Sequence, residues 1–403
     1  MSTNYYDIYQ NSPKFSDEFF GQFLRTIGKA YTQCADIGEC YITLNKIKDE
    51  DFDSWFNAWS EIAYYLQHSA NESWNRKHYQ TAAMTYLRAT EYHRASEFFL
   101  RGNMNDGRIL PCFDQMQYCF ERSLTGLHPS AKKVLIPYDN TTLPGYLFLT
   151  RGNAKATLIA PGGYDSCVEE MYPLVNVSLQ HGYNLFIFDA PGQGHALRRQ
   201  RLHMRHDFEQ VMSQVIDFLE IEFKHELQSY VLVGRSFGGY LAPRAACFES
   251  RLSGLICDPG QLDIAGALNK IIPTEIQPQF EREDQEAVNT YFSKLFSKNK
   301  MKAFYFLSRM NTHGITTPYD YFQEMKQYTL KDKVHNIKCP TLVCDNPSDK
   351  ISNRGNTLFD ALQCDKTYAT FTAKWGAGMH CEADGTGQFQ AVMFDWLDEK
   401  FAK

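Results

Sequence analysis

The spacing of hydrophobic positions divides the chain into two parts of different character. From about residue 15 to residue 127, apolar side chains recur every three or four positions, which predicts helices packed on one another. Residues 79–100 are rich in alanine and aromatic residues, and Gly102 after them is a natural C-cap. We therefore predict one long helix over this range. The clearest helical stripes are Phe52, Trp55, Phe56, Trp59, Ile62, Ala63 and Leu66, and Phe113, Met116, Phe120 and Leu124. We therefore predict a helical domain over residues 1–130.

After Pro129, short apolar runs alternate with helical patterns. Residues 133–138 and 143–149 predict two strands joined by a turn. Wholly apolar strands separated by helices are typical of a parallel sheet covered on both faces, so we predict an α/β domain over residues 131–403. Residues 263–329 lack a strong strand pattern and predict a helical insertion over the active edge of the sheet. Further strands are predicted at 156–160, 184–189, 229–233, 252–258, 340–344 and 368–373, and helices at 168–180, 207–223, 356–362 and 389–401.

Composition and charge narrow the classes of partner and location. The 403 residues carry a net charge of −6 without a basic cluster, so we expect no nucleic-acid partner. Polar residues interrupt residues 1–40, and no segment has about 18 consecutive apolar residues, so we expect no membrane partner and a cytoplasmic location. The eleven cysteines never form C-x-x-C, which argues against a structural zinc site and a disulfide framework.

One motif carries most of the chemical information. An apolar strand pattern runs into Gly234-Arg235-Ser236-Phe237-Gly238 and continues as a helix. Small residues on both sides of a serine allow the sharp strand-to-helix turn called a nucleophile elbow. The alternative is a glycine-rich turn with a helix-capping serine, which the flanking strand and helix disfavour. We predict Ser236 as a nucleophile.

A serine nucleophile needs a base and an acid that orients the base. Functional groups collect at the carboxyl ends of parallel strands, so we searched there in the order Ser, acid, His. Asp349 follows the strand at 340–344 by a few residues, and we prefer it to Asp345, which is better placed to bind backbone in its loop. His380 lies in a glycine-rich loop between the last strand and the last helix. The adjacent Cys381 is predicted to serve packing.

The negative oxygen formed during such a reaction needs N–H donors. The N–H of Phe237 is one candidate, and the turn after the strand at 156–160 offers a second from Gly163 or Tyr164. Neither this turn nor Pro191-Gly192-Gln193-Gly194 has phosphate-loop spacing, which disfavours nucleotide binding. We expect no cofactor and no metal.

Three segments together resemble a specific family. These are residues 162–170, residues 188–194 and the run Gly234 to Gly239. They are similar to the branch of α/β-hydrolases that includes fermentation-respiration switch proteins, dihydroxypseudooxynicotine hydrolase and polyketide-shortening hydrolases. The likeness extends from about Ala82 to the C-terminus and implies an α/β-hydrolase fold with Ser236, Asp349 and His380 as its triad. Several members cleave a carbon–carbon bond beside a ketone.

The resemblance also bears on the substrate pocket. Asp258, which ends the strand after the elbow helix, lies where this branch places a pocket residue, although it could instead cap a turn. We include Arg235 and Asp165 in the same predicted pocket. Tyr164 and Val168 differ from the residues common in the family, which affects the pocket and not the triad. Glu169 and Glu170 are expected to be structural, because acids at a helix start suit the helix dipole.

The predicted activity is retro-Claisen cleavage of a polyketide-like or aromatic 1,3-dicarbonyl, with ring closure as a further outcome. An esterase or lactonase is the alternative, and a regulatory binding protein on a hydrolase scaffold is the third. A 14% aromatic content fits a small, apolar, aromatic substrate. The helical N-terminal domain suggests a homodimer.

Overall fold

The structure is a computed structural model that describes residues 14–402. It forms two compact units. The N-terminal unit contains the described residues up to Ser130 together with Ala383–Gly387, and the second unit contains Ala131–Glu382 and the residues from Gln388 onward. The five residues after Glu382 therefore pack with the helical unit. The backbone of Ala383 lies very close to that of Gly28, because a Cβ added to Gly28 would lie 1.8 Å from the carbonyl oxygen of Ala383.

The N-terminal unit is built from helices, as the three- and four-residue spacing predicts. Helix α5 packs against both α4 and α6. Asp51 directly precedes helix α4, and its carboxylate accepts the N–H groups of Asp53 and Ser54 and so caps the helix. The helices are α2 (Asp17–Ile27), α3 (Ile37–Leu44), α4 (Phe52–Asn75), α5 (Tyr79–Ser96) and α6 (Ile109–Leu127).

The long helix predicted over residues 79–100 is shorter in the structure. Helix α5 ends at Ser96, and a 3₁₀ turn follows over Phe98–Leu100. The break allows the ring of Phe99 to stack on Phe19, with ring centroids 4.3 Å apart, and to meet Trp55 edge-on.

No helix within residues 14–402 combines the length and the apolar character needed to cross a membrane.

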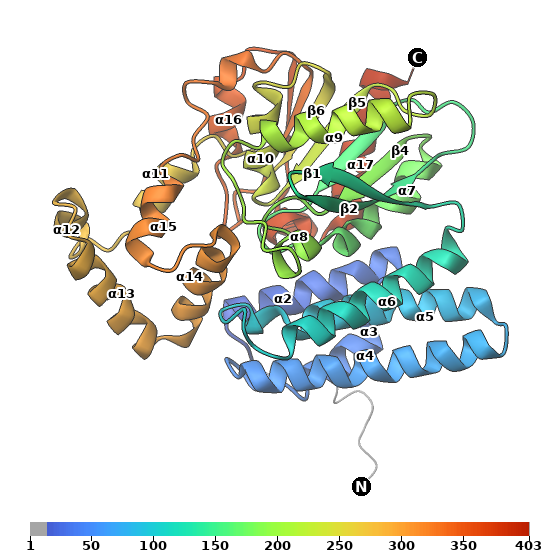
Figure 1. Ribbon diagram of the computed structural model, residues 1–403, viewed down its shortest axis with the longest axis horizontal. Coiled ribbons are helices and arrows are strands. Elements are labelled where there is room, and N and C mark those ends of the chain that lie inside the picture. Colours follow the sequence, from blue (N-terminus) through green and yellow to red (C-terminus); the bar gives the residue numbers. More distant parts are fainter. Residues whose placement is uncertain (1–13, 403) are drawn as a thin grey trace, which may run out of the picture. The chain divides into compact units, whose positions relative to one another are not determined.

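The second unit is organised around an eight-stranded sheet with the order β1-β2-β4-β3-β5-β6-β7-β8 (Figure 1). The hairpin β1–β2 and the pair β2–β4 are antiparallel, and the other pairs are parallel. Strands β3 and β4 are buried along their whole length, which explains their unbroken apolar sequences. The strands are β1 (Lys132–Tyr138), β2 (Thr141–Phe148), β3 (Thr157–Pro161), β4 (Asn184–Phe188), β5 (Tyr230–Arg235), β6 (Leu252–Asp258), β7 (Thr341–Asp345) and β8 (Lys366–Thr370).

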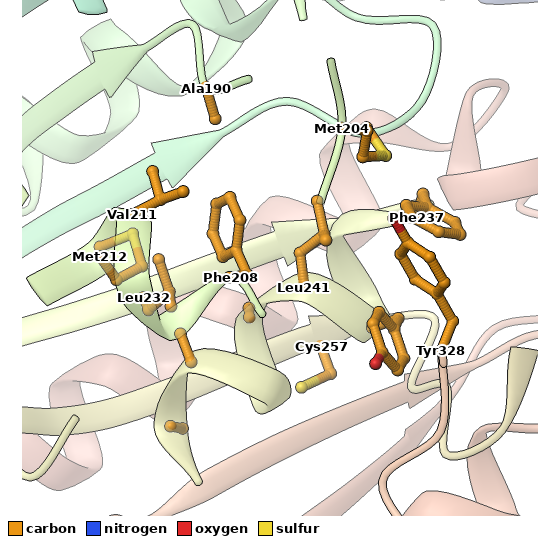
Figure 2. Packing of buried hydrophobic residues seen from close by; sticks show 14 of the residues in the cluster. Ala190, Met204, Phe208, Val211, Met212, Leu232, Phe237, Leu241, Cys257 and Tyr328 are labelled. Atoms are coloured by element: carbon orange, nitrogen blue, oxygen red, sulfur yellow. The ribbon is translucent and has the colours of Figure 1, made fainter. Parts of the chain in front are cut away.

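Helices cover both faces of this sheet. Figure 1 shows α9 (Glu209–Glu222) and α10 (Gly238–Ala246) in front of the strands and α17 (Thr386–Phe401) behind them. Side chains of β5, α9 and α10 share one core, in which Leu232, Leu241 and Val211 are fully buried (Figure 2). The shorter helices are α7 (Val175–Gln180), α8 (Gly194–Arg198) and α16 (Gly355–Ala361).

The segment between β6 and β7 is a helical insertion. Its base is closed by an antiparallel bridge between Asp263 and Thr329. Its interior is aromatic: the ring of Phe292 packs 5.2 Å from Phe306 and 5.5 Å from Phe322. The helices of the insertion are α11 (Ile264–Asn269), α12 (Gln277–Glu281), α13 (Gln285–Lys298), α14 (Lys300–His313) and α15 (Pro318–Met325).

The turn between β5 and α10 is the tightest point of this unit. Ser236 has φ of 58°, a left-handed conformation that few non-glycine residues adopt. A Cβ added to Gly234 would lie 2.0 Å from the carbonyl oxygen of Gly238, and one added to Gly239 would lie 1.9 Å from that of Pro259. Both glycines are therefore required by close backbone approach, although Gly239 lies outside the G-x-S-x-G pattern.

Neighbouring glycines in this turn provide a matched test. We expect Gly239→Ala to lower the free energy of unfolding by about 3 kcal/mol, because backbone must move to admit the methyl group. Gly238→Ala meets only the carbonyl oxygen of Gly162 at 3.5 Å, and we expect it to leave stability unchanged or raise it by up to about 1 kcal/mol. Urea denaturation measures both; equal stability of the two variants would contradict the packing of Gly239.

Candidate active site

Three side chains that are far apart in sequence meet at the carboxyl edge of the sheet. Nε2 of His380 lies 2.8 Å from Oγ of Ser236, and Nδ1 lies 2.6 Å from Oδ2 of Asp349. Ser236 is in the turn after β5, Asp349 is in the loop after β7, and His380 begins a 3₁₀ turn after β8. The structure thus brings together the serine, acid and histidine that the sequence analysis selected, in hydrogen-bonding order.

Asp349 and Asp345 differ in what they bind. Oδ1 of Asp349 accepts the N–H of Ile351 at 2.7 Å, which leaves Oδ2 for the imidazole. Asp345 accepts the N–H of Asn346 and, at 2.6 Å, the hydroxyl of Tyr368, so it is used within its own loop and by β8. Geometry therefore favours Asp349 as the partner of the histidine.

Asn346 joins the two loops that carry the acid and the histidine. Its side-chain amide donates to the carbonyl oxygens of Ala377 and Met379, each at 3.1 Å, and the residue is 1% exposed. Sequence reasoning missed this residue, because its partners lie more than 30 positions away and no local pattern marks them. Its bonds hold the segment immediately before His380.

The turn after β3 lies directly against the serine. A Cβ added to Gly163 would lie 3.0 Å from Cβ of Ser236 and 3.3 Å from the backbone nitrogen of Phe237. Only glycine permits this approach. Within residues 14–402, the N–H groups of Gly163, Tyr164 and Phe237 donate to no other group. Unbonded N–H groups beside a serine hydroxyl are what an oxyanion requires.

Gln193 holds this turn from behind. Its side-chain nitrogen donates to the carbonyl oxygens of Gly162 and Gly163, and its side-chain oxygen accepts the N–H groups of Gly162 and Ala190. The residue is 1% exposed and lies within residues 188–194, one of the segments that carry the family resemblance. The four bonds fix the peptide planes on which the N–H groups are carried.

Two of the predicted pocket residues bind each other. Nε of Arg235 donates to Oδ2 of Asp258 at 2.7 Å, and Nη2 of Arg235 donates to the carbonyl oxygen of Cys381. Asp258 is 1% exposed. The pair therefore ties β5 and β6 to the residue after His380. Asp165, the third residue of this set, is half-buried and interacts electrostatically with Arg309 of α14.

Glu382 lies beside this ion pair and is 1% exposed. Burial and the neighbouring carboxylate of Asp258 raise the pKa of Glu382 to about 10, so the side chain is a neutral acid at pH 7. Cys381 and Glu382 both have positive φ, of 51° and 47°. Burial also raises the pKa of the Cys381 thiol, whose Sγ donates to the carbonyl oxygen of Asp258. Cys381 is thus a packed thiol rather than a reactive one.

Glu169 lies in the first turn of a short helix, as predicted, and it is buried there. The segment from Val168 to Leu174 is a 3₁₀ helix, and Glu169 is 4% exposed with neither carboxyl oxygen hydrogen-bonded within residues 14–402. Burial, followed by the charge of Asp189, raises the pKa of Glu169 to about 8, which weakens the contribution of its charge to the helix start at pH 7. Asp189 instead accepts the N–H groups of Val168 and His195.

No group of three or more His, Cys, Asp or Glu side chains in the described part of the chain is placed to hold a metal ion.

Comparison with known proteins identifies the family. A family model described as the alpha/beta hydrolase family matches residues 158–387. The protein is an α/β-hydrolase.

Relatives and solved structures extend the comparison of this α/β-hydrolase to both of its units. Hydrolase LUC6 of a Fusarium species is 33% identical, with 96% of this chain and 97% of the relative covered. The 20-hydroxy-prefusarin hydrolase FUS2 of Gibberella moniliformis is 32% identical, with 96% and 98% covered. The structure of 2,6-dihydroxy-pseudo-oxynicotine hydrolase superposes with a TM-score of 0.72 at 18% identity, covering 93% of this chain and 95% of that one. The resemblance inferred from the sequence motifs is confirmed.

The neutral state of Glu382 can be tested by replacement with its isosteric amide. In the unfolded α/β-hydrolase this carboxyl ionises near its ordinary pKa of 4.5, whereas the folded protein keeps the proton up to about pH 10. The wild type therefore loses stability as the pH rises between these values, by at most about 1.4 kcal/mol per pH unit from this group. Glu382→Gln has no such loss. We expect its stability advantage over the wild type to grow from pH 5 to pH 9.

Thermal unfolding at several pH values measures this difference. Glu399→Gln, an exposed change on α17, is the matched control and should give no trend with pH. A constant difference between Glu382→Gln and the wild type would show that Glu382 is ionised in the folded protein.

Proposed function

We propose that this α/β-hydrolase cleaves a carbon–carbon bond next to a ketone, using Ser236 as nucleophile, His380 as general base and acid, and Asp349 as the group that orients His380. The observation that carries the proposal is the position of the His380 imidazole, within 2.8 Å of the serine oxygen and 2.6 Å of the carboxylate. Asp349 fixes Nδ1 as the protonated nitrogen and stabilises the imidazolium, so Nε2 is free to take the serine proton.

The first half-reaction is addition followed by bond cleavage. Oγ of Ser236 adds to the ketone carbon while its proton moves to Nε2 of His380, and the N–H groups of Phe237 and of Gly163 or Tyr164 bind the resulting oxyanion. When the carbonyl re-forms, the carbon–carbon bond breaks and its electron pair moves to the leaving carbon. His380 then protonates that carbon. The products are the shortened ketone and an ester on Ser236.

The second half-reaction restores the serine. A water molecule loses its proton to His380 and adds to the ester carbonyl, the oxyanion forms again, and Ser236 leaves with the proton from His380. The released product is a carboxylic acid. A carbon nucleophile within the acyl group could replace water at this step, which would close a ring.

The leaving group limits the substrate class. A carbanion leaves at a useful rate only when a second carbonyl delocalises it as an enolate, so we propose a 1,3-dicarbonyl. One relative is named 20-hydroxy-prefusarin hydrolase, which supports a small organic molecule as the substrate. An ester would use the same three side chains, with an alkoxide as the leaving group.

Removal of either reactive side chain should abolish turnover. We expect Ser236→Ala to eliminate labelling by a fluorophosphonate probe, and both Ser236→Ala and His380→Ala to lower kcat by at least about 10³-fold, with the fold retained. His335→Ala, which removes an exposed histidine, should leave kcat unchanged. Turnover that survives Ser236→Ala would overturn the assignment, and a wild type that the probe does not label would favour a binding protein.

Mass spectrometry of the products identifies the bond. Aromatic 1,3-diketones and aryl esters of similar size should be incubated with the wild type in parallel. We expect the diketone to yield a carboxylic acid and a methyl ketone in equal amounts, with one oxygen from labelled water in the acid. If the protein hydrolyses the esters but does not cleave the diketone, the result would contradict the proposed carbon–carbon cleavage and would show that the protein is an esterase.

A further inference from the structure

The helical insertion contacts both residues that flank the proposed oxyanion hole. The ring of Tyr164 lies 4.2 Å from that of Phe237, measured between centroids, and Phe237 lies 5.5 Å from Tyr328 at the base of the insertion. Figure 2 shows the rings of Phe237 and Tyr328 beside each other. Phe237 and Tyr164, which carry two of the three candidate N–H donors, therefore extend their side chains into one aromatic cluster.

His313 is the polar centre of this cluster. Its Nε2 is hydrogen-bonded to the hydroxyl of Tyr164, and its Nδ1 lies 3.2 Å from the hydroxyl of Tyr328. The hydroxyl of Tyr321 on α15 lies 3.3 Å from that of Tyr164. Both ring nitrogens of a histidine that is 8% exposed are thus used by tyrosines. A buried histidine satisfied at both nitrogens holds its partners in one arrangement.

Local structure explains how His313 reaches this position. It is the last residue of α14, which ends at Gly314 with φ of 68°, a left-handed C-cap. A Cβ at Gly314 would lie 2.4 Å from Nδ1 of His203. Burial, together with His203 and Arg309, lowers the pKa of His313 to about 3, so the ring is neutral and can accept at one nitrogen while donating at the other.

We infer that His313 is a positioning residue of the oxyanion hole, and that the insertion sets the rate of acylation by holding the Tyr164 side chain. This inference rests on the proposed serine hydrolase function. The turn that contains Gly162, Gly163 and Tyr164 is fixed at two points: the side chain of Gln193 binds its carbonyl groups, and His313 and Tyr321 hold the Tyr164 ring.

The candidate donor N–H groups lie between these two anchor points of the turn. They donate to no other group within residues 14–402, so their direction depends on the anchors of the turn. Loss of one oxyanion donor costs about 10²- to 10³-fold in kcat, and a displacement of about 1 Å can cost about 10²-fold. Loss of one of the two attachments of the turn should lower kcat by a smaller but measurable factor. Because Tyr164 binds His313 through its hydroxyl, removal of that hydroxyl should have the same effect as removal of the imidazole.

The test compares variants of the full chain with a fluorophosphonate probe and with an aryl ester. We expect His313→Phe, which removes both nitrogens, to lower the rate constant for labelling Ser236 by about 10-fold and kcat by a similar factor, with KM little changed. His313→Gln keeps a donor and an acceptor and should recover most of the rate. Tyr164→Phe should match His313→Phe, and the double variant should be no slower than either, because the two residues act through one contact.

Tyr291→Phe is the matched control. It removes a tyrosine hydroxyl that binds Glu275 at 2.8 Å elsewhere in the insertion, and it should label at the wild-type rate. Thermal unfolding establishes that each variant is folded. If His313→Phe does not fold, the labelling rates of Tyr164→Phe and His313→Gln are compared with that of the wild type, and only Tyr164→Phe should be slower by about 10-fold.

The outcomes separate this inference from the proposed function. A wild type that is labelled at Ser236 while folded His313→Phe and Tyr164→Phe keep its rate would overturn the positioning role and leave the proposed function intact. Additive effects in the double variant would also overturn it. Absence of labelling in the wild type would remove the proposed function, and the inference with it.

Discussion

An imidazole that accepts a serine proton needs an acid on its other nitrogen and a fixed backbone on either side. His380 has both. The carbonyl groups of Ala377 and Met379, just before it, accept from Asn346, and the carbonyl of Cys381, just after it, accepts from Arg235. Arg235 precedes Ser236 directly. The bonds that hold the backbone around His380 therefore come from the loop that carries Asp349 and from the strand that leads into Ser236.

Buried acidic groups and strained backbone, both of which destabilise a fold, surround this site. Asp258 is a buried carboxylate, and it is stable because Arg235 compensates its charge at 2.7 Å. The nearby acid Glu382 avoids a second buried charge by keeping its proton. Strained backbone at Ser236, Cys381 and Glu382 concentrates at the same edge of the sheet. Strain of this kind persists where surrounding contacts determine the conformation, as they do here.

The sequence was informative where a local pattern has one structural solution. Apolar strands that alternate with helices predict a parallel sheet, and its carboxyl edge then selects Ser236, Asp349 and His380 from many alternatives. It was uninformative where the partner is distant. Gln193 and Asn346 look like ordinary loop residues, His313 is one of twelve histidines, and Gly239 is needed because of Pro259. Helix α5 also ends earlier than its periodicity predicts, because Phe99 is held by rings from α2 and α4.

Gln193 determines when the turn after β3 acquires its shape. Its amide donates to the carbonyl groups of both Gly162 and Gly163 and so restrains both peptide planes in the folded protein. The entropy of ordering this turn is therefore lost once, during folding, and not at every encounter. In the proposed function, the turn is therefore already shaped for an oxyanion before a substrate arrives, which is closer to lock-and-key than to induced fit.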